Sequence, residues 1–276
     1  MLDSHHHLWN YDPEQYPWIP PESALAQDYL IPELIANTDA AGVTGTIAVQ
    51  ARQTLEESDW LLSLADETDR IKGVVGWVPL AEDNVGEHLE RLSQHHKFKA
   101  VRHVVQDEPD DNFILGDEFN KGIAKLKDFD LIYDILIFQK HLPPTIEFVD
   151  RHPNQLFVID HIAKPVIHNG RIEKEWRSGM TALAERENIC AVKVSGMVTE
   201  VTNDTIDEVT LRNYLYETLE IFGAKRVSFG TDWPVCLLRI DSYLDWATSM
   251  RNYVAELSAH EQAAVLHETC AAAYRL

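Results

Sequence analysis

The chain opens with M-L-D-S-H-H-H-L-W, residues 1–9, and this stretch distinguishes between two fold classes. Met1–His5 is the first strand candidate. An open, doubly wound sheet that binds a dinucleotide has a glycine-rich turn directly after that strand, whereas here His6, His7 and Leu8 follow it. A barrel instead places polar catalytic groups where its strands end. The N-terminal stretch therefore favours a barrel over an open sheet.

Seven further short apolar runs follow, at intervals that leave room for a helix in most gaps. They are Gly45–Gln50, Gly73–Val78, Ala100–Val105, Leu131–Leu136, Leu156–Asp160, Ala191–Ser195 and Arg226–Gly230. Strands separated by helices pair in parallel through crossover connections, and eight such units favour closure. We therefore predict an α/β fold, a (β/α)8 TIM barrel that occupies residues 1–276 as a single domain.

Start and stop signals mark several of the intervening helices. Thr54 followed by Glu57 is a capping-box pattern at the start of an amphipathic segment. Pro32 suits the first turn of a helix, and Gly42 lies just beyond the end of that segment. Gly223 is placed to end another helix.

The charge balance and the cysteines exclude several classes of function. The 45 Asp and Glu residues against 24 Lys and Arg give a net charge of −21, which repels the phosphates of nucleic acids. No apolar run approaches the roughly 20 residues needed to cross a bilayer, and the N-terminus does not resemble a signal peptide. The three cysteines lack C-x-x-C spacing and predict neither disulfides nor a thiolate zinc site. We expect a cytoplasmic monomer or homodimer without nucleic-acid or membrane partners.

The first strand ends in a pair of histidines with the spacing of a ligand pair. Because successive strand residues face opposite sides, His5 and His7 point the same way and His6 points away. Two such imidazoles can bind one divalent cation. The alternative is that they hold a water molecule or a substrate oxygen.

The sixth strand ends V-I-D-H-I-A-K-P, residues 158–165. Asp160 and His161 are adjacent and cannot share a face of a regular strand, so one of them should reach the barrel mouth. We expect that residue to be His161, and its alternative role is a histidine bonded to a backbone carbonyl. Lys164 in the following loop could neutralise an anion.

The eighth strand ends V-S-F-G-T-D-W-P-V, residues 227–235. A carboxylate that leaves an apolar strand near imidazoles or a cation stays ionised and can accept a proton from water. Asp232 is therefore the candidate general base. An N-cap or turn aspartate is the alternative interpretation of the same motif.

Basic and aromatic residues at the other strand ends predict the walls of a pocket. Arg52, Arg102 and Lys193 would make a cationic mouth suited to a carbonyl or carboxylate substrate, although each could equally form a structural ion pair. Trp233 offers a flat apolar wall or fills the barrel. The stretch Trp9–Asp28, which includes Trp18, is a proline-rich aromatic loop, either a pocket wall or a loop packed on itself.

Six stretches together resemble the lactonase branch of the amidohydrolase superfamily, and the resemblance covers essentially the whole chain. They are D-S-H-H-H-L-W (3–9), V-Q-A-R-Q-T-L-E-E (49–57), V-R-H-V-V-Q-D-E-P-D (101–110), V-I-D-H-I-A-K-P (158–165), V-K-V-S-G-M (192–197) and F-G-T-D-W-P-V (229–235). Y-P-W-I at Tyr16–Ile19 and the pair Arg102–His103 are most similar to the members that act on sugar lactones.

The resemblance implies a hydrolase that opens a lactone of a sugar acid, such as L-fucono- or L-rhamnonolactone. It implies catalytic roles for Asp232, as general base, and His161. It places His5, His7, His161 and Asp232 around the lactone carbonyl or around one divalent ion, with Zn²⁺ the first choice. The resemblance, together with the strand-end aromatic and basic residues, makes the substrate-binding set Trp9, Trp18, Arg52, Arg102, His103, Gln139, Lys193 and Trp233. Arg102 and His103 stand where a bridging residue for a second metal would lie, so a binuclear centre is not expected. Whether the single ion is required stays open, because several relatives act without one.

Two other functions fit parts of the same residue set. A metal-dependent decarboxylase of the same superfamily, acting on an aromatic or enoic acid, uses a similar set of histidines and an aspartate. A barrel that binds a sugar acid without catalysis would not need Asp232 or His161. A phosphate-handling barrel is disfavoured, because no glycine-rich phosphate cup is visible near the seventh and eighth strands.

Overall fold

Eight parallel strands form one sheet whose order follows the sequence, as a computed structural model of residues 1–276 shows. The strands are β1 (Leu2–His6), β2 (Gly45–Val49), β3 (Ile71–Gly76), β4 (Phe98–Val104), β5 (Ile132–Leu136), β6 (Phe157–Ile159), β7 (Ile189–Val194) and β8 (Val227–Phe229). Each predicted strand overlaps one of these, and the ends differ by a few residues. The boundaries differ most at β3, which spans Ile71–Gly76 rather than Gly73–Val78.

The sheet closes through the segment that follows β8 rather than through β8 itself. The amide of Asp232 donates to the carbonyl of His5 at 2.8 Å, and the amide of His7 donates to the carbonyl of Trp233 at 2.7 Å. These bonds pair the end of β1 with the residues after β8. The predicted (β/α)8 barrel is therefore confirmed, and four predicted site residues, His5, His7, Asp232 and Trp233, lie at its seam.

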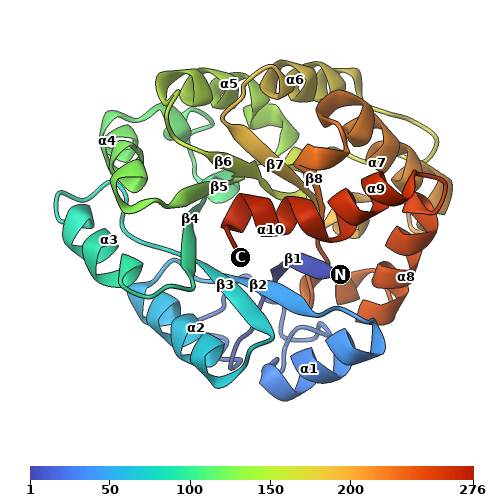
Figure 1. The fold of residues 1–276 in the computed structure, drawn as a ribbon, viewed down its shortest axis with the longest axis horizontal. Coiled ribbons are helices and arrows are strands. Elements are labelled where there is room, and N and C mark those ends of the chain that lie inside the picture. The colour runs from blue at the N-terminus through green and yellow to red at the C-terminus, as the bar shows by residue number, and fades with distance from the viewer.

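Ten helices follow or separate the strands, and α1 to α8 surround the barrel in a ring (Figure 1). They are α1 (Ile31–Ala40), α2 (Leu55–Glu67), α3 (Val85–Ser93), α4 (Asp117–Leu126), α5 (Leu142–Arg151), α6 (Lys174–Ala184), α7 (Glu208–Phe222), α8 (Tyr243–Val254), α9 (Ala259–Ala263) and α10 (Thr269–Tyr274). None of them combines the length and the apolarity that crossing a bilayer demands.

The predicted helix signals lie where helices begin and end. The hydroxyl of Thr54 accepts a bond from the amide of Glu57 at the start of α2, and Gly223 ends α7 with a φ of 74°. Glu57 does not complete the capping box. Its carboxylate accepts from the amides of Ala51 and Arg52 at 2.9 and 2.7 Å, so it fixes the loop after β2 instead.

The core has two parts, and α10 closes the inner one. A large apolar cluster fills the space between the strands and the surrounding helices, and a smaller one fills the barrel. The smaller cluster combines strand residues such as Ile47 and Val75 with Cys270, Ala273 and Tyr274 of α10. Figure 1 shows α10 lying across the centre of the barrel on the viewer's side. One end of the barrel is therefore filled with hydrocarbon, and the chemistry is confined to the other end.

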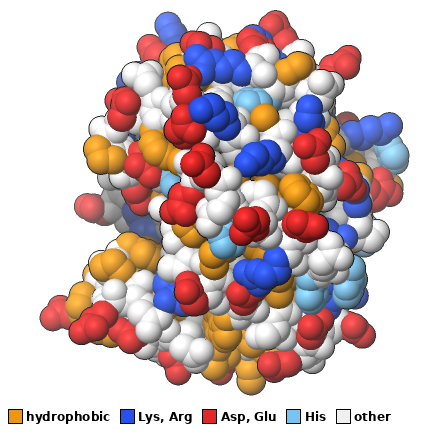
Figure 2. All heavy atoms as spheres, turned by 90° about the vertical axis from the view of Figure 1, so that its left-hand side faces the viewer, with side chains coloured by type: hydrophobic (Ala, Val, Ile, Leu, Met, Phe, Trp, Pro, Cys, Tyr) orange, Lys and Arg blue, Asp and Glu red, His pale blue; other side chains and the backbone are white.

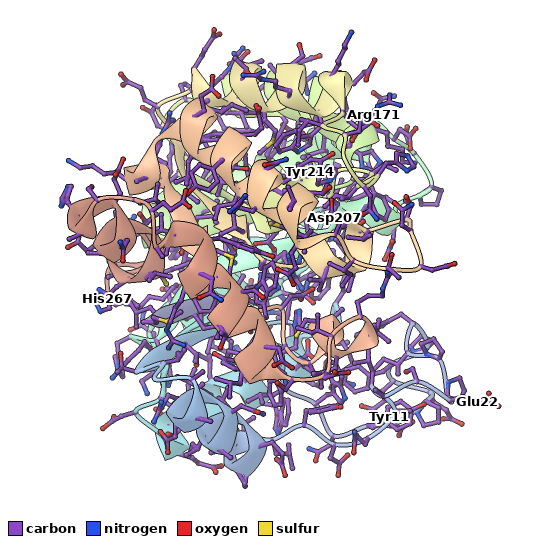
Figure 3. The ribbon with its side chains drawn as sticks, turned by 90° about the vertical axis from the view of Figure 1, so that its right-hand side faces the viewer. Tyr11, Glu22, Arg171, Asp207, Tyr214 and His267 are labelled. Atoms are coloured by element: carbon purple, nitrogen blue, oxygen red, sulfur yellow. The ribbon has the colours of Figure 1, made fainter.

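The loops after the strands gather at the opposite end from the C-terminal helices. Figure 3 places Tyr11, Glu22, Arg171 and Asp207 on one side of the molecule and His267 on the other. The first two belong to the loop after β1, which projects as a lobe, and the other two follow β6 and β7. Figure 2 shows acidic and basic side chains interspersed over one flank of the barrel, with apolar ones scattered among them.

Candidate functional site

Three imidazoles surround one carboxylate oxygen at the mouth of the barrel. Oδ1 of Asp232 lies 3.3 Å from Nε2 of His7, 3.7 Å from Nε2 of His5 and 3.9 Å from Nε2 of His161. All four residues are at most 5% exposed. The structure therefore brings together the four residues that the sequence placed around one reacting centre.

An irregularity in β1 lies beside the two histidines, His5 and His7, that face this centre. Asp3 pairs with Thr46 and His6 with Ala48, so β1 holds one more residue than β2 between the paired positions. The Nε2 atoms of His5 and His7 are 3.2 Å apart. His6 is buried on the other side, and neither of its ring nitrogens has a hydrogen-bond partner.

A left-handed turn after β6 presents His161. The strand ends at Ile159, and His161 has a φ of 52°, which non-glycine residues rarely adopt. Its Nδ1 lies 2.9 Å from the hydroxyl of Ser195, at the end of β7. The turn separates the two adjacent polar residues: His161 faces the mouth, and Asp160 faces the interior of the barrel.

Burial and the neighbouring charges set the protonation states. Burial lowers the pKa of His161 to about 4 and that of His5 well below its usual value. Burial alone would raise the pKa of Asp232, but His161 and His7 hold it below its ordinary value. At neutral pH His5 and His161 are therefore neutral and Asp232 is ionised, a set that can accept a proton or bind a cation.

The donor set fits one divalent cation. Nδ1 of His7 lies 2.8 Å from the carbonyl oxygen of Val49, which can only accept, so that nitrogen carries the hydrogen. The lone pair of Nε2 then faces the Asp232 carboxylate, and two electron-rich atoms stand 3.3 Å apart. His5, His7 and Asp232 each offer one ligand atom, and these atoms lie within 4.8 Å of one another. A histidine oriented by a carbonyl in this way is typical of metal sites.

Gly196, directly after Ser195, packs against two members of the centre. A Cβ atom at this position would lie 2.6 Å from Nδ1 of His161 and 3.1 Å from Oδ2 of Asp232, and the φ of Gly196 is +63°.

We expect Gly196→Ala to displace both side chains and to lower kcat by about 10²-fold, because small misplacements in an active site have effects of that size. Steady-state kinetics would test this. Gly170→Ala is the matched control, since its φ is +77° but nothing lies within 4 Å. Equal losses in the two variants would assign the effect to backbone strain alone.

A layer of buried ions lies directly beneath the centre, inside the barrel. Nζ of Lys193 contacts Asp134 at 2.6 Å and Asp160 at 2.9 Å, and the guanidinium of Arg102 donates to Asp160 at 3.0 Å. Tyr274 of α10 donates to the same Asp134 oxygen at 2.7 Å. The ion pairs therefore link the apolar floor of the barrel to its catalytic end.

This ionic layer also contacts His5. Nδ1 of His5 lies 3.3 Å from Nζ of Lys193 and 3.4 Å from Asp160, and its Nε2 lies 3.3 Å from Arg102. Although burial opposes it, Lys193 and His5 hold the pKa of Asp160 well below its usual range. Lys193, which the sequence predicted to contact substrate, is fully buried and does not line the cavity above, and two carboxylates hold its ammonium.

A cavity of about 740 Å³ opens above the centre. Six predicted site residues line it: His7, Trp18, Arg52, Arg102, His161 and Asp232. His5 lies behind His7 and is fully buried. Trp18 is 43% exposed at the rim, where its indole nitrogen donates to the carbonyl of Ala51. The projecting loop after β1 therefore forms one wall of this cavity.

Four further predicted substrate contacts lie away from this cavity. Trp9 and Trp233 are buried among aromatic side chains that include Tyr29. His103 follows Arg102 on β4 and faces outward, bonded to Glu108 at 2.7 Å. Gln139 lines a neighbouring cavity of about 1030 Å³ between α5 and α6, which shares Lys164 and Glu200 with the first, and its side-chain oxygen accepts a bond from the amide of Val166. The structure does not support substrate contacts for these four.

Several cavity residues carried no strand-end signal in the sequence. Gln15 lies in the aromatic loop and bonds the guanidinium of Arg52, and Glu200 follows β7 at a distance. Burial raises the pKa of Glu200, and Lys164, 3.5 Å away, counteracts that shift. Lys164 also lines the cavity. The motif D-H-I-A-K-P was the only sequence signal for this pair, and it pointed to Lys164 alone.

Comparison with known proteins identifies relatives that match over most of their length. An L-fucono-1,5-lactonase of Burkholderia multivorans is 35% identical and is aligned over 100% of this chain and 96% of its own. Another, of Burkholderia ambifaria, is 34% identical over 86% of this chain and 81% of its own. A solved amidohydrolase of B. multivorans with bound zinc superposes with a TM-score of 0.93 at 35% identity, covering 100% of this chain and 99% of that one.

The amidohydrolase family model matches residues 2–276. This match agrees with the resemblance in the six sequence stretches, with the closed (β/α)8 barrel, and with the histidine–aspartate centre at the end where the strand-following loops gather. The chain belongs to the amidohydrolase family of enzymes.

Proposed function

We propose that this protein hydrolyses lactones of sugar acids, with L-fucono-1,5-lactone as the first substrate to test. The observation that carries the proposal is the contact of the Asp232 carboxylate with three imidazoles at the base of a cavity large enough for one sugar ring. The name of the 35% identical relative supports the substrate class. A lactone is an activated ester, so its opening requires a positioned water molecule, a base and stabilisation of an oxyanion.

Asp232 removes the proton from the attacking water in this proposal. Its carboxylate is ionised at neutral pH, because His161 and His7 hold the pKa of Asp232 below its ordinary value although burial opposes this. The water oxygen attacks the lactone carbonyl carbon, and the electron pair of the C=O bond moves to the carbonyl oxygen. Asp232 then holds the proton that the reaction needs later.

His161 and Arg102 stabilise the oxyanion of the tetrahedral intermediate. If the Ser195 hydroxyl donates to Nδ1 of His161, then Nε2 carries the hydrogen and faces the cavity as a donor. Arg102 lines the cavity and holds a permanent charge. Removal of one such donor typically lowers kcat by about 10²–10³-fold.

Ring opening completes the reaction. The bond between the former carbonyl carbon and the ring oxygen breaks, and the leaving alkoxide takes the proton held by Asp232. The product is one open-chain hydroxy acid, and Asp232 returns to its ionised form. One carboxylate therefore serves both proton transfers.

His5, His7 and Asp232 are the residues that would hold a metal ion, and Zn²⁺ is the ion that we propose. Imidazole and carboxylate ligands suit zinc, and the related B. multivorans amidohydrolase was solved with it. When bound, such an ion lowers the pKa of a water molecule to about 7. His161, whose Nδ1 contacts Ser195, then acts as a hydrogen-bond donor rather than a ligand.

We expect the purified protein to bind about one equivalent of Zn²⁺ and His7→Ala to lose most of that binding, since a lost ligand weakens the site directly. Calorimetry and elemental analysis would measure the stoichiometry. His260→Ala, an exposed histidine outside the site, is the control. Equal binding by His7→Ala and the unaltered protein would remove His7 from the metal site, and full activity of a zinc-free preparation would show that the ion is dispensable.

A panel of aldonolactones, assayed with a pH indicator, tests the proposed function. We expect acid release from L-fucono-1,5-lactone or a close stereoisomer, at rates well above spontaneous hydrolysis. The same preparations are assayed for CO₂ release from aromatic and enoic acids. Decarboxylation without lactone opening would overturn the proposal in favour of the decarboxylase alternative.

A further inference from the structure

Four consecutive non-glycine residues after β6 have left-handed backbone conformations. The φ angles are 52° for His161, 48° for Ile162, 58° for Ala163 and 44° for Lys164. Left-handed conformations are unfavourable for L-residues with a Cβ atom, and they normally occur singly. A run of four persists only where the surrounding structure fixes it, and such strain concentrates at functional sites.

The surroundings fix this turn at several points. The indole of Trp176 on α6 donates to the carbonyl of Ile162 at 2.7 Å, and the side chains of Ile162 and Ala163 are fully buried. The amide of Lys164 donates to the carbonyl of His161 at 2.9 Å. The two middle residues anchor the turn, and its first and last residues, His161 and Lys164, are left to face the cavity.

Lys164 is held at the cavity wall by only one ionic partner. Its Nζ lies 3.5 Å from Oε1 of Glu200, with both side chains largely buried, and 5.4 Å from the centre of the Phe138 ring. An ammonium has three donors. A separation of 3.5 Å is long for a charge-assisted hydrogen bond, so the pair leaves donor capacity for a ligand in the cavity.

Arg102 is more fully occupied than Lys164. It bonds Asp160 and the carbonyl of Gln50 and contacts His5. Arg52 bonds Gln15, and its Nε lies 3.9 Å from Glu57 without a hydrogen-bond partner, but Arg52 stands beside the projecting loop rather than on the turn that carries His161. Lys164 is therefore the cation with free donors that lies on the same turn as His161.

We propose that Lys164 contacts the lactone carbonyl oxygen as it becomes negative, and the same oxygen in the carboxylate product. The inference rests on the proposed lactone hydrolysis and adds a substrate-contacting residue to it. Glu200 is a positioning residue that holds the ammonium at the wall when the cavity contains no anion. The neutral substrate gains little from Lys164, whereas the oxyanion and the product gain most.

Lys164→Met in the full chain tests this distinction. We expect kcat to fall by about 10²-fold, the size of the loss when one oxyanion donor is removed, with KM for the neutral lactone within about threefold. Inhibition by the ring-opened acid (L-fuconate for L-fucono-1,5-lactone) should weaken by at least about tenfold. Lys164→Arg should keep part of both properties. Lys121→Met is the control, because Lys121 is exposed, pairs with Glu118 and lines neither cavity.

Three results would overturn the inference. A higher KM with unchanged kcat and unchanged product inhibition would indicate that Lys164 contacts a sugar hydroxyl of the substrate instead of the carbonyl oxygen. Recovery of kcat in Lys164→Met/Glu200→Gln would show that an unpaired Glu200 carboxylate caused the loss. If calorimetry showed that the unaltered protein and Lys164→Met bind the ring-opened acid equally tightly, a contact between Lys164 and the carboxylate would be excluded, whether or not turnover occurs. Lactone opening that is equally fast in both proteins would refute only the Lys164 role, whereas no opening and no acid binding by the unaltered protein would refute the proposed function as well.

Discussion

Asp232→Asn is expected to lower kcat for lactone hydrolysis by about 10⁴-fold, the upper end of what a positioned general base contributes. The amide keeps the size of the carboxylate but cannot accept a proton from water. Because the cavity walls are unchanged, lactone affinity should remain nearly the same. Steady-state kinetics would measure kcat, and calorimetric titration of the variant with the lactone would measure its affinity.

The interpretation of Asp232→Asn requires a metal measurement, because Asp232 is also a candidate ligand. Zinc content is therefore determined for each preparation. Asp241→Asn, at an exposed aspartate after the same strand, is the matched control. A variant that retains zinc and loses turnover would support the base role, whereas one that retains kcat would exclude it.

Lys193→Met is expected to destabilise the protein by about 3–5 kcal/mol, because it leaves the buried Asp134 carboxylate without a cation and leaves Asp160 with Arg102 alone. Asp134 and Asp160 lie 2.6 and 2.9 Å from Nζ, and all three side chains are fully buried. At about 2–4 °C per kcal/mol for a chain of roughly this size, Tm should fall by about 6–20 °C. Thermal unfolding followed by circular dichroism would measure the shift.

Lys121→Met is the control for this stability prediction. Lys121 pairs with Glu118 on the surface, and both side chains are more than half exposed. Such a pair contributes about 0–1 kcal/mol. If both variants unfolded at the same temperature as the unaltered protein, the buried layer would not be a source of stability, and the two carboxylates would have to take up protons instead.

The barrel could be predicted from sequence because its signals are local and repeated. Short apolar runs such as Gly45–Gln50 alternate with capped amphipathic segments, and each unit can be recognised without knowledge of the others. The lack of a glycine-rich turn after Met1–His5 argued against an open, doubly wound sheet. Closure could not be predicted in detail, because the seam depends on the amides of His7 and Asp232, which are 225 residues apart.

The candidate site was predictable where regular strand geometry applies. Alternation places His5 and His7 on one side, and the same rule turns His103 away once Arg102 faces inward. Other positions depend on irregular backbone: His161 and Lys164 reach the cavity only through a left-handed turn. The burial of Lys193 could not be predicted, since its two carboxylate partners lie on other strands.

The contact between Tyr274 and Asp134 has a consequence for efforts to change what the enzyme accepts. Tyr274 lies at the apolar floor, yet its hydroxyl is joined through Asp134 and Lys193 to His5. Laboratory evolution that randomises only the cavity lining would leave this support untouched and would overlook α10. Libraries that include position 274 would instead vary the contacts that support His5, through a residue that no substrate contacts.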